Sequence, residues 1–144
     1  MKIRVKLVIG IVLSGIIALL LVYLFIYNKP HTNYETEEVT SQLAVKELYH
    51  SFLSNKPLAD SLYTGKMILI EGILTKTETA DSMVTAVFVL DQGMFGDEGV
   101  RCVLLPKSYD LITRFKGGDR VKIKGFCSGY NDTDVILEHC SILN

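Results

Sequence analysis

The segment RVKIKGFCSGYNDTDVILEHCSIL, residues 120–143, decides the fold class of this chain. Apolar and polar side chains alternate over 120–127 and again over 134–143, which is the period of a β-strand. A polar Gly-Tyr-Asn-Asp sequence typical of a turn lies between them, and Gly125 and Gly129 leave the backbone room to curl. We therefore predict that the chain ends in a β-hairpin.

Three further segments upstream have the composition of strands: 67–76, 84–90 and 100–105. Between the third and fourth strands, residues 108–115 carry enough apolar side chains for one or two helical turns. Five strands with a helix in this position is the order of an OB-fold, a partly open Greek-key barrel. Gly72 falls inside the first strand, where such a barrel needs a sharp bend. We predict an α+β, mainly β domain built on a five-stranded OB-fold barrel.

A helix is predicted in front of the barrel, over residues 37–55. Its apolar residues recur at three- and four-residue spacing and form one stripe: Ala44, Val45, Leu48 and Phe52. Glu37 and Glu38 suit the positive end of the helix dipole, and Asn55-Lys56-Pro57 ends the pattern.

The N-terminal segment from Leu7 to Ile26 contains no charged residue. Twenty apolar residues in a helix span roughly 30 Å, the thickness of the hydrocarbon core of a bilayer. We predict a transmembrane signal anchor over 1–27, a polar tether over 28–36 and the OB-fold-like domain over 37–144. Lys2, Arg4 and Lys6 precede the span, so the N-terminus is expected in the cytoplasm and the domain outside it, in the periplasm.

Two alternatives to an uncleaved anchor were weighed. A cleavable signal peptide would end in small residues, whereas this apolar run ends in the bulky Tyr23-Leu-Phe-Ile-Tyr27. A bacterial lipoprotein signal would place a cysteine directly after the run, and the first cysteine is Cys102. Both observations favour a permanent single-pass anchor.

The charge of the remaining chain argues against nucleic acid as a partner. Three of the fifteen Lys and Arg residues precede the span, so twelve remain against sixteen Asp and Glu, a formal charge of −4. Non-specific affinity for nucleic acid comes mainly from cations that neutralise phosphates. We therefore expect no nucleic-acid partner.

Four segments carry a family resemblance: LYTGKMILIEGIL (62–74), GVRCVLL (99–105), GDRVKIKGFCSG (118–129) and DVILEHCSIL (134–143). They resemble the tRNA-anticodon-like (tRNA_anti-like) OB-fold family of bacterial envelope proteins, over roughly residues 40 to 143. The matching positions are Tyr63, Gly65, Lys66, Gly72, Gly118, Asp119, Gly125, Cys127, Gly129 and Cys140. They are structural turns and barrel glycines, so the resemblance implies a fold and an envelope location and implies no activity.

The three cysteines all fall on predicted strands, at Cys102, Cys127 and Cys140. No Cys-x-x-Cys motif is present and the histidines are scattered, so we predict no metal site, no cofactor and no catalytic residue. An oxidising compartment allows a disulfide of Cys140 with Cys127 along the hairpin, or with Cys102 because the third strand of an OB barrel lies beside the fifth. Three buried free thiols are the third alternative.

The candidate binding face combines two sets of residues. OB barrels commonly bind on their second and third strands, which here present Arg101 and Val103. Arg120, Lys122 and Lys124 alternate with apolar residues and place three cations on one strand face. We predict a membrane-anchored, non-enzymatic module that binds an envelope protein, peptide or glycan. The alternatives are a cysteine-dependent redox or enzymatic envelope factor, and oligonucleotide binding by analogy of fold.

Overall fold

The computed structural model describes residues 2–27 and 33–143. The chain forms two compact units, residues 1–32 and 33–144, which are considered separately here. The predicted tether at 28–36 falls largely on residues 28–32, outside the described residues. Residues 33–36, which were also assigned to the tether, belong to the second unit.

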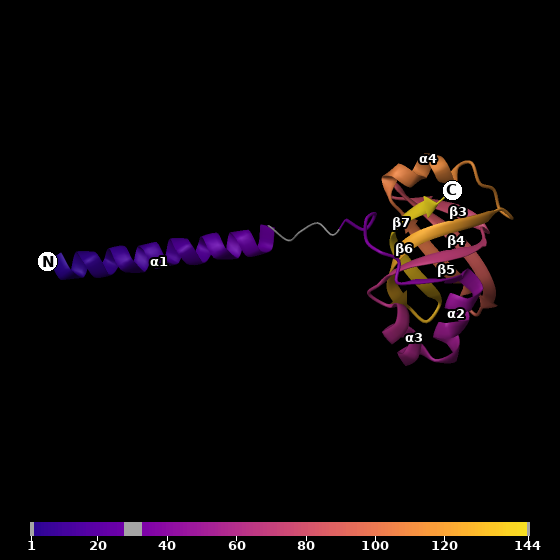
Figure 1. The fold of residues 1–144 in the computed structure, drawn as a ribbon, viewed down its shortest axis with the longest axis horizontal. Helices are drawn as coiled ribbons and strands as arrows, with labels where there is room; N and C mark the ends of the chain where they lie inside the picture. Colours follow the sequence, from indigo (N-terminus) through magenta and orange to yellow (C-terminus); the bar gives the residue numbers. More distant parts are fainter. Residues whose placement is uncertain (1, 28–32, 144) are drawn as a thin grey trace. The chain divides into compact units, whose positions relative to one another are not determined.

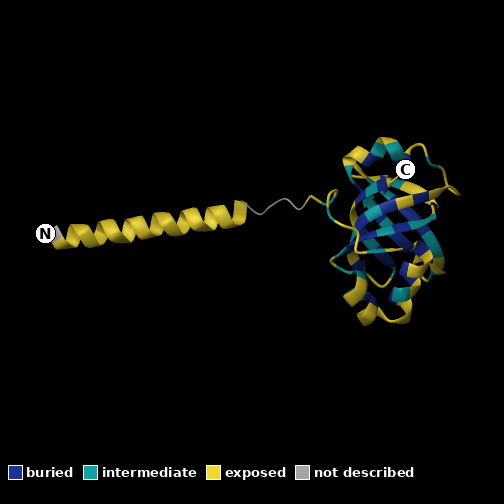
Figure 2. Cartoon of the chain, in the orientation of Figure 1, coloured by how far each residue is buried: buried dark blue, intermediate teal, exposed yellow. Residues whose placement is uncertain are grey.

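The described part of the first unit is one helix, α1 (Lys2–Tyr27), which includes the predicted span (Figure 1). Residues 3–27 are long and apolar enough to cross a membrane, and none of this stretch is buried. Figure 2 shows the whole helix as exposed surface. The described structure thus leaves these apolar side chains without protein cover.

The second unit is a curved seven-stranded sheet with short helices at its two ends (Figure 1). The strands are β1 (Ser41–Ala44), β2 (Met67–Ile73), β3 (Lys76–Ala80), β4 (Met83–Gly93), β5 (Gly96–Leu104), β6 (Arg120–Tyr130) and β7 (Asp134–Leu143). Helices α2 (Val45–Ser54) and α3 (Lys56–Tyr63) lie at one end. The 3₁₀ turn η1 (Pro106–Ser108) and α4 (Tyr109–Ile112) lie at the other.

The order across the sheet is β1-β2-β6-β7-β5-β4-β3. The expected neighbours are present: β5, the third predicted strand, pairs in parallel with β7, the fifth. The prediction of five strands in a barrel is wrong in two respects, because the sheet has seven strands and it is open, with β1 and β3 as its edges. One extra strand arises because the predicted strand 67–76 breaks at Leu74 and Thr75, giving β2 and β3. Leu74 and Thr75 alone connect β2 to β3, although β2 is second in the sheet order and β3 is last. The sheet must therefore curl strongly to bring these two strands together.

The helix predicted over 37–55 is also wrong in its first half. Residues 41–44 form β1, which pairs in parallel with β2, and α2 begins only at Val45. Of the predicted stripe, Val45, Leu48 and Phe52 are buried as expected, whereas Ala44 belongs to the strand and is exposed. Pairing with β2 satisfies the backbone here and places Leu43 against the core, which outweighs the helical spacing.

The β4–β5 hairpin is longer than predicted. Residues 91–99, expected as a loop, are mostly strand, with Met94 and Phe95 alone between the two strands. The helix predicted over 108–115 is shorter than expected. Within that range only Ser108, the last residue of η1, and the four residues of α4 are helical.

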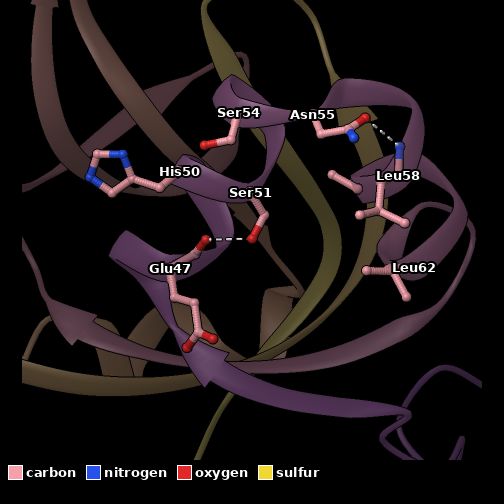
Figure 3. A pocket seen from close by; sticks show the side chains of 8 residues that line it. Glu47, His50, Ser51, Ser54, Asn55, Leu58 and Leu62 are labelled. Carbon is pink, nitrogen blue, oxygen red and sulfur yellow. Dashed lines mark hydrogen bonds between the residues drawn. The ribbon is translucent and has the colours of Figure 1, made fainter.

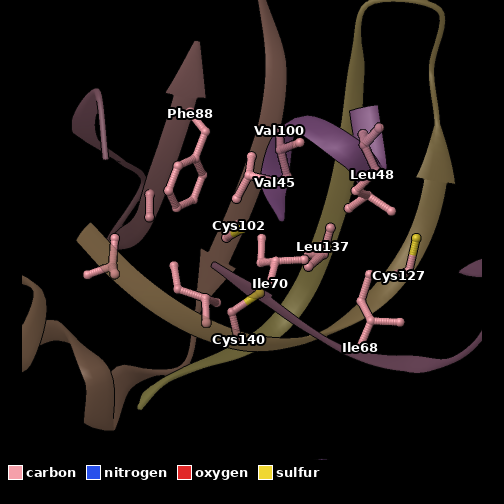
Figure 4. Packing of buried hydrophobic residues seen from close by; sticks show 14 of the residues in the cluster. Val45, Leu48, Ile68, Ile70, Phe88, Val100, Cys102, Cys127, Leu137 and Cys140 are labelled. Carbon is pink, nitrogen blue, oxygen red and sulfur yellow. The ribbon is translucent and has the colours of Figure 1, made fainter. Parts of the chain in front are cut away.

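The core fills the inside of the curved sheet, closed by α2 and α3 (Figure 2). Its largest fully buried side chains include Tyr49, Phe52 and Phe88. Figure 4 shows aliphatic side chains of α2, β2, β5 and β7 meeting there, with all three cysteines among them.

Candidate functional site

The outer surface of β1, β2, β6 and β7 carries the basic residues that the sequence predicted, and we call it the β6 face. Cross-strand register places its members side by side: Gln42, Ala44, Leu69, Glu71, Ile73, Arg120, Lys122, Lys124, Ser141 and Leu143. The alternate residues of β6, Val121 and Ile123, are buried in the core. Strict alternation along β6 therefore produces the row of cations.

Glu71 is the one carboxylate on this face, and two cations share it. Arg120 Nη1 lies 3.2 Å from Glu71 Oε1, and Lys122 Nζ lies 3.6 Å from Glu71 Oε2. The hydrogen bond from Arg120, with the nearby charge of Lys122, lowers the pKa of the Glu71 carboxyl. Arg120 keeps 69% of its side chain exposed. Counting Lys124, the face carries three cations against one anion.

Two hollows flank the Arg120–Glu71 pair. One, of about 250 Å³, is lined by Phe115, Val121 and Leu143 with Arg120, Lys122 and Glu71. The other, of about 470 Å³, lies over β1 and is also lined by Glu71 and Arg120. Exposed apolar side chains border the charges, since Ile73 is 52% and Leu143 is 39% exposed. The β6 face is thus a mixed basic and apolar surface.

The structure separates the predicted binding residues into two groups. Arg101 of β5 pairs with Ile136 of β7, which in turn pairs with Gly129 of β6. Lys122 lies seven positions before Gly129 on β6. At about 3.3 Å per residue Arg101 and Lys122 are more than 20 Å apart along the strands. Arg101 therefore does not belong to the β6 face, and Val103 lies on β5, which β7 separates from β6.

Arg101 is engaged by neighbouring carboxylates. Its Nε donates to Asp134 Oδ2 at 2.9 Å and its Nη1 donates to Glu78 Oε2 at 2.7 Å. Burial opposes its charge, but these two hydrogen bonds raise the pKa of Arg101 overall. Asp134 also accepts from the backbone N–H of Gly99 at 3.0 Å. This arrangement holds β5 against β7, and we assign it a structural role.

A third hollow, of about 360 Å³, lies between α2 and α3 (Figure 3). Leu58, Ala59 and Leu62 form its apolar part, and the polar part contains Glu47, His50, Ser51, Ser54 and Asn55. The trio of Glu47, His50 and Ser51 is not a catalytic arrangement, because the Ser51 hydroxyl donates to the Glu47 carbonyl at 2.8 Å. A nucleophilic serine needs that proton directed at a base.

The three cysteines are free, buried thiols. Burial raises the pKa of Cys140 well above its ordinary value, and the neighbouring Cys102 thiol adds to the shift. Cys127 faces Leu137, which faces Cys102 on the other side, so β7 separates Cys127 from Cys102 (Figure 4). Burial raises the pKa of Cys127 to about 11. Raised pKa values oppose thiolate formation, the step that makes a cysteine reactive.

Metal ligands do not gather in the described part of the chain, where no three His, Cys, Asp or Glu side chains converge. His50 lies on α2 and His139 on β7, while His31 is outside the described residues. Two residues of this region were not predicted from the sequence. Glu71 organises the β6 face, and Tyr34 stacks on His139 next to that face. Tyr34 is an aromatic residue in an otherwise polar segment, and that contrast was the available signal.

A sequence profile of the tRNA_anti-like family matches residues 1–142. The chain belongs to the tRNA_anti-like family. This match includes the fold-defining strands and confirms the resemblance seen in the sequence. A search of curated protein sequences finds no significant match.

Three solved structures are similar to this tRNA_anti-like chain. One is a Klebsiella pneumoniae lipoprotein described as a candidate nucleic-acid-binding protein, with 14% identity and a TM-score of 0.54 over 72% of this chain and 91% of that one. Others are an OBody bound to hen egg-white lysozyme (14% identity, TM-score 0.39, 56% and 82% covered) and the yeast Stn1 and Ten1 structure (14%, 0.39, 80% and 68%). At these identities the first match shows a shared fold, and the other two add no argument.

Proposed function

We propose that this chain is a membrane-anchored, non-enzymatic binding module of the bacterial envelope, with the β6 face as its ligand surface. The observation that carries the proposal is that Arg120 and Lys122 share the carboxylate of Glu71, beside two hollows that both include Arg120. Such a surface has an excess of positive charge and suits an anionic group carried on a partly apolar ligand.

The anchoring part of the proposal is supported by α1. A helix of this length covers about 37 Å, more than the hydrocarbon core of a bilayer, and its apolar side chains are exposed along its length. Exposed apolar surface of this extent needs cover, and lipid supplies it. Lys2, Arg4 and Lys6 at its start favour the orientation in which the domain lies outside the cytoplasm.

The absence of catalysis is part of the same proposal. Burial holds the thiols of Cys127 and Cys140 in their protonated form, and the charged groups of β5 are engaged in ion pairs that connect strands. In the α2–α3 hollow the Ser51 hydroxyl donates to the Glu47 carbonyl, and the Asn55 side-chain oxygen accepts from the Leu58 N–H at the start of α3. Each of these sites therefore has a structural explanation.

Oligonucleotide binding is the rival that the fold suggests. OB-folds bind single strands with aromatic side chains and a positive groove on the surface of the second and third strands. That surface here holds Lys76, Glu78, Asp97, Arg101 and Asp134, which pair with one another and sum to −1. This charge favours a different ligand and a different face.

Site-specific photo-crosslinking in living cells tests the proposal. A photoreactive residue at Leu143, on the β6 face, should form a defined adduct with an envelope component, and the R120Q/K122Q pair should remove it. The same photoreactive residue at Met83, which is also exposed and lies on the β3–β4 hairpin, is the positional control. Adducts that form at Met83 and not at Leu143 would contradict the assignment of the face. Release of the chain from membranes by alkaline carbonate would contradict the anchor.

A further inference from the structure

The start of the second unit lies across the β6 face. The Tyr34 ring stacks on His139 with 3.9 Å between centroids and 3° between planes, and it meets Phe126 edge-on at 5.6 Å. Phe126 continues the outward row of β6, two positions after Lys124. Residues 33–37, which we call the strap, are therefore fixed on the same row as the exposed cations.

Two lysine side chains bind the strap. Lys124 Nζ donates to the carbonyl of Glu35 at 2.9 Å and to the carbonyl of Glu37, and Lys107 forms an ion pair with Glu35. Lys124 is thus used to secure the strap, while the side chains of Arg120 and Lys122 at the other end of the row are 69% and 47% exposed. The strap occupies one end of the β6 face and leaves the basic end open.

The length of the connecting chain limits how far this face can be from the end of α1. Five residues, 28–32, join Tyr27 to Asn33. An extended chain covers at most about 3.6 Å per residue, so the six steps from Tyr27 to Asn33 span no more than about 22 Å. If α1 spans a bilayer, as proposed above, the strap enters the domain within that distance of the lipid headgroups.

We propose that the β6 face docks on the anionic phospholipid headgroups of the membrane in which α1 is anchored. Arg120 and Lys122 bind lipid phosphates, and Ile73 and Leu143 beside them contact the interfacial region. Basic side chains are drawn to an anionic lipid surface within about one Debye length, and exposed apolar residues add to the attachment. The combination of charge, apolar border and short link favours lipid over a soluble acidic protein.

This inference rests on the proposed anchoring, and its test separates the two. The chain contains no tryptophan, so a single introduced tryptophan reports without background. Ile73→Trp places it on the β6 face and Met83→Trp places it away from that face, at positions that are each 52% exposed. The full chain with either reporter is reconstituted in vesicles that contain a brominated lipid quencher. The vesicles are phosphatidylcholine alone, or equal parts phosphatidylcholine and phosphatidylglycerol.

The expected result is quenching of the Ile73→Trp signal in the anionic vesicles and little quenching of the Met83→Trp signal in either. The R120Q/K122Q pair should remove the quenching, as should salt near about 1 M, where the Debye length is about 3 Å. K46Q/K56Q is the matched control, because it removes the same charge from the helical end of the domain and should leave the quenching intact.

Vesicle flotation is measured on the same samples. Chains that do not float with the vesicles would refute the anchoring, and with it this inference. Chains that float but show equal quenching at both positions, or equal quenching in neutral and anionic lipid, would overturn the docking alone. Photo-crosslinks from Leu143 to a protein, with no quenching at Ile73→Trp, would assign the β6 face to a protein partner and also overturn the docking.

Discussion

Gly125→Ala should destabilise the domain strongly, because the inner side of β6 has no room for a side chain at this position. A methyl group there would lie 2.5 Å from Cys140 Sγ and 3.2 Å from Leu137 Cδ2. Cys140 and Leu137 are fully buried, so neither can turn toward solvent to make space. Gly125 also sits where the β6–β7 register shifts, and β7 would have to move away from β6.

Overpacking of this kind costs about 1–3 kcal/mol. That is a large fraction of the roughly 5–15 kcal/mol that keeps a typical domain folded. Cys140→Ala alone removes one sulfur atom from the core and should cost about 1 kcal/mol. In the double variant the new methyl group occupies the vacated space. Its loss of unfolding free energy should therefore be smaller than the sum of the two single losses by about 1–2 kcal/mol, a typical coupling for residues in contact.

The assay is urea unfolding of the full chain in detergent micelles under reducing conditions, followed through the tyrosine near-ultraviolet signal. Gly72→Ala supplies the control, because its methyl group would meet Val45 Cγ2 at 2.7 Å in another part of the core. Its cost should add to that of Cys140→Ala, since the atoms nearest to the new methyl group belong to Val45 and Phe88 and not to Cys140. An unchanged midpoint for Gly125→Ala, or strict additivity with Cys140→Ala, would refute the packing argument.

Four further predictions follow from the same structure. Denatured, unreduced protein should contain three alkylatable thiols, because all three cysteines are free and buried; a Cys102–Cys140 disulfide in peptide maps without reduction, worth about 4 kcal/mol by the chain-entropy relation for a loop of this length, would contradict this. Protease added to intact spheroplasts should digest the domain, and full protection would reverse the predicted orientation. Residues 33–144 alone should unfold in one cooperative transition by calorimetry, because they contain the whole core; a broad, non-cooperative melt would count against this. Single-stranded oligonucleotides should bind weakly at physiological salt by fluorescence anisotropy, and submicromolar affinity lost in R120Q/K122Q would show that the β6 face binds nucleic acid.

The strands of the C-terminal half were the most predictable part of the fold. The predicted strand 134–143 coincides with β7, and the prediction over 120–127 falls within β6. Both strands have one face in the core and one in solvent, so burial imposes a strict period of two on the sequence. The neighbouring strands β4 and β5 were found but shortened, because their ends carry Asp91, Asp97 and Gly99, which have low strand propensity.

The candidate site was only partly predictable. The alternation of β6 was enough to predict that Arg120, Lys122 and Lys124 share a face, and their register with β2 confirms it. The grouping of this row with Arg101 was wrong, because it depends on the position of β5 relative to β6. That position is set by β7, which lies between them.

The sequence by itself determined the apolar N-terminal helix, the family, and which residues of β6 and β7 face the core. These properties depend on local composition and on the period of side chains along a strand, which any window of the chain contains. Only the tertiary structure decided that Glu71 joins Arg120 and Lys122, that Cys140 meets Cys102, and that the strap lies on β6. These contacts join residues that are far apart along the chain, and the curvature of the sheet and the order of its strands bring them together. No local pattern encodes that order, because it is fixed by how all the strands pack around one core.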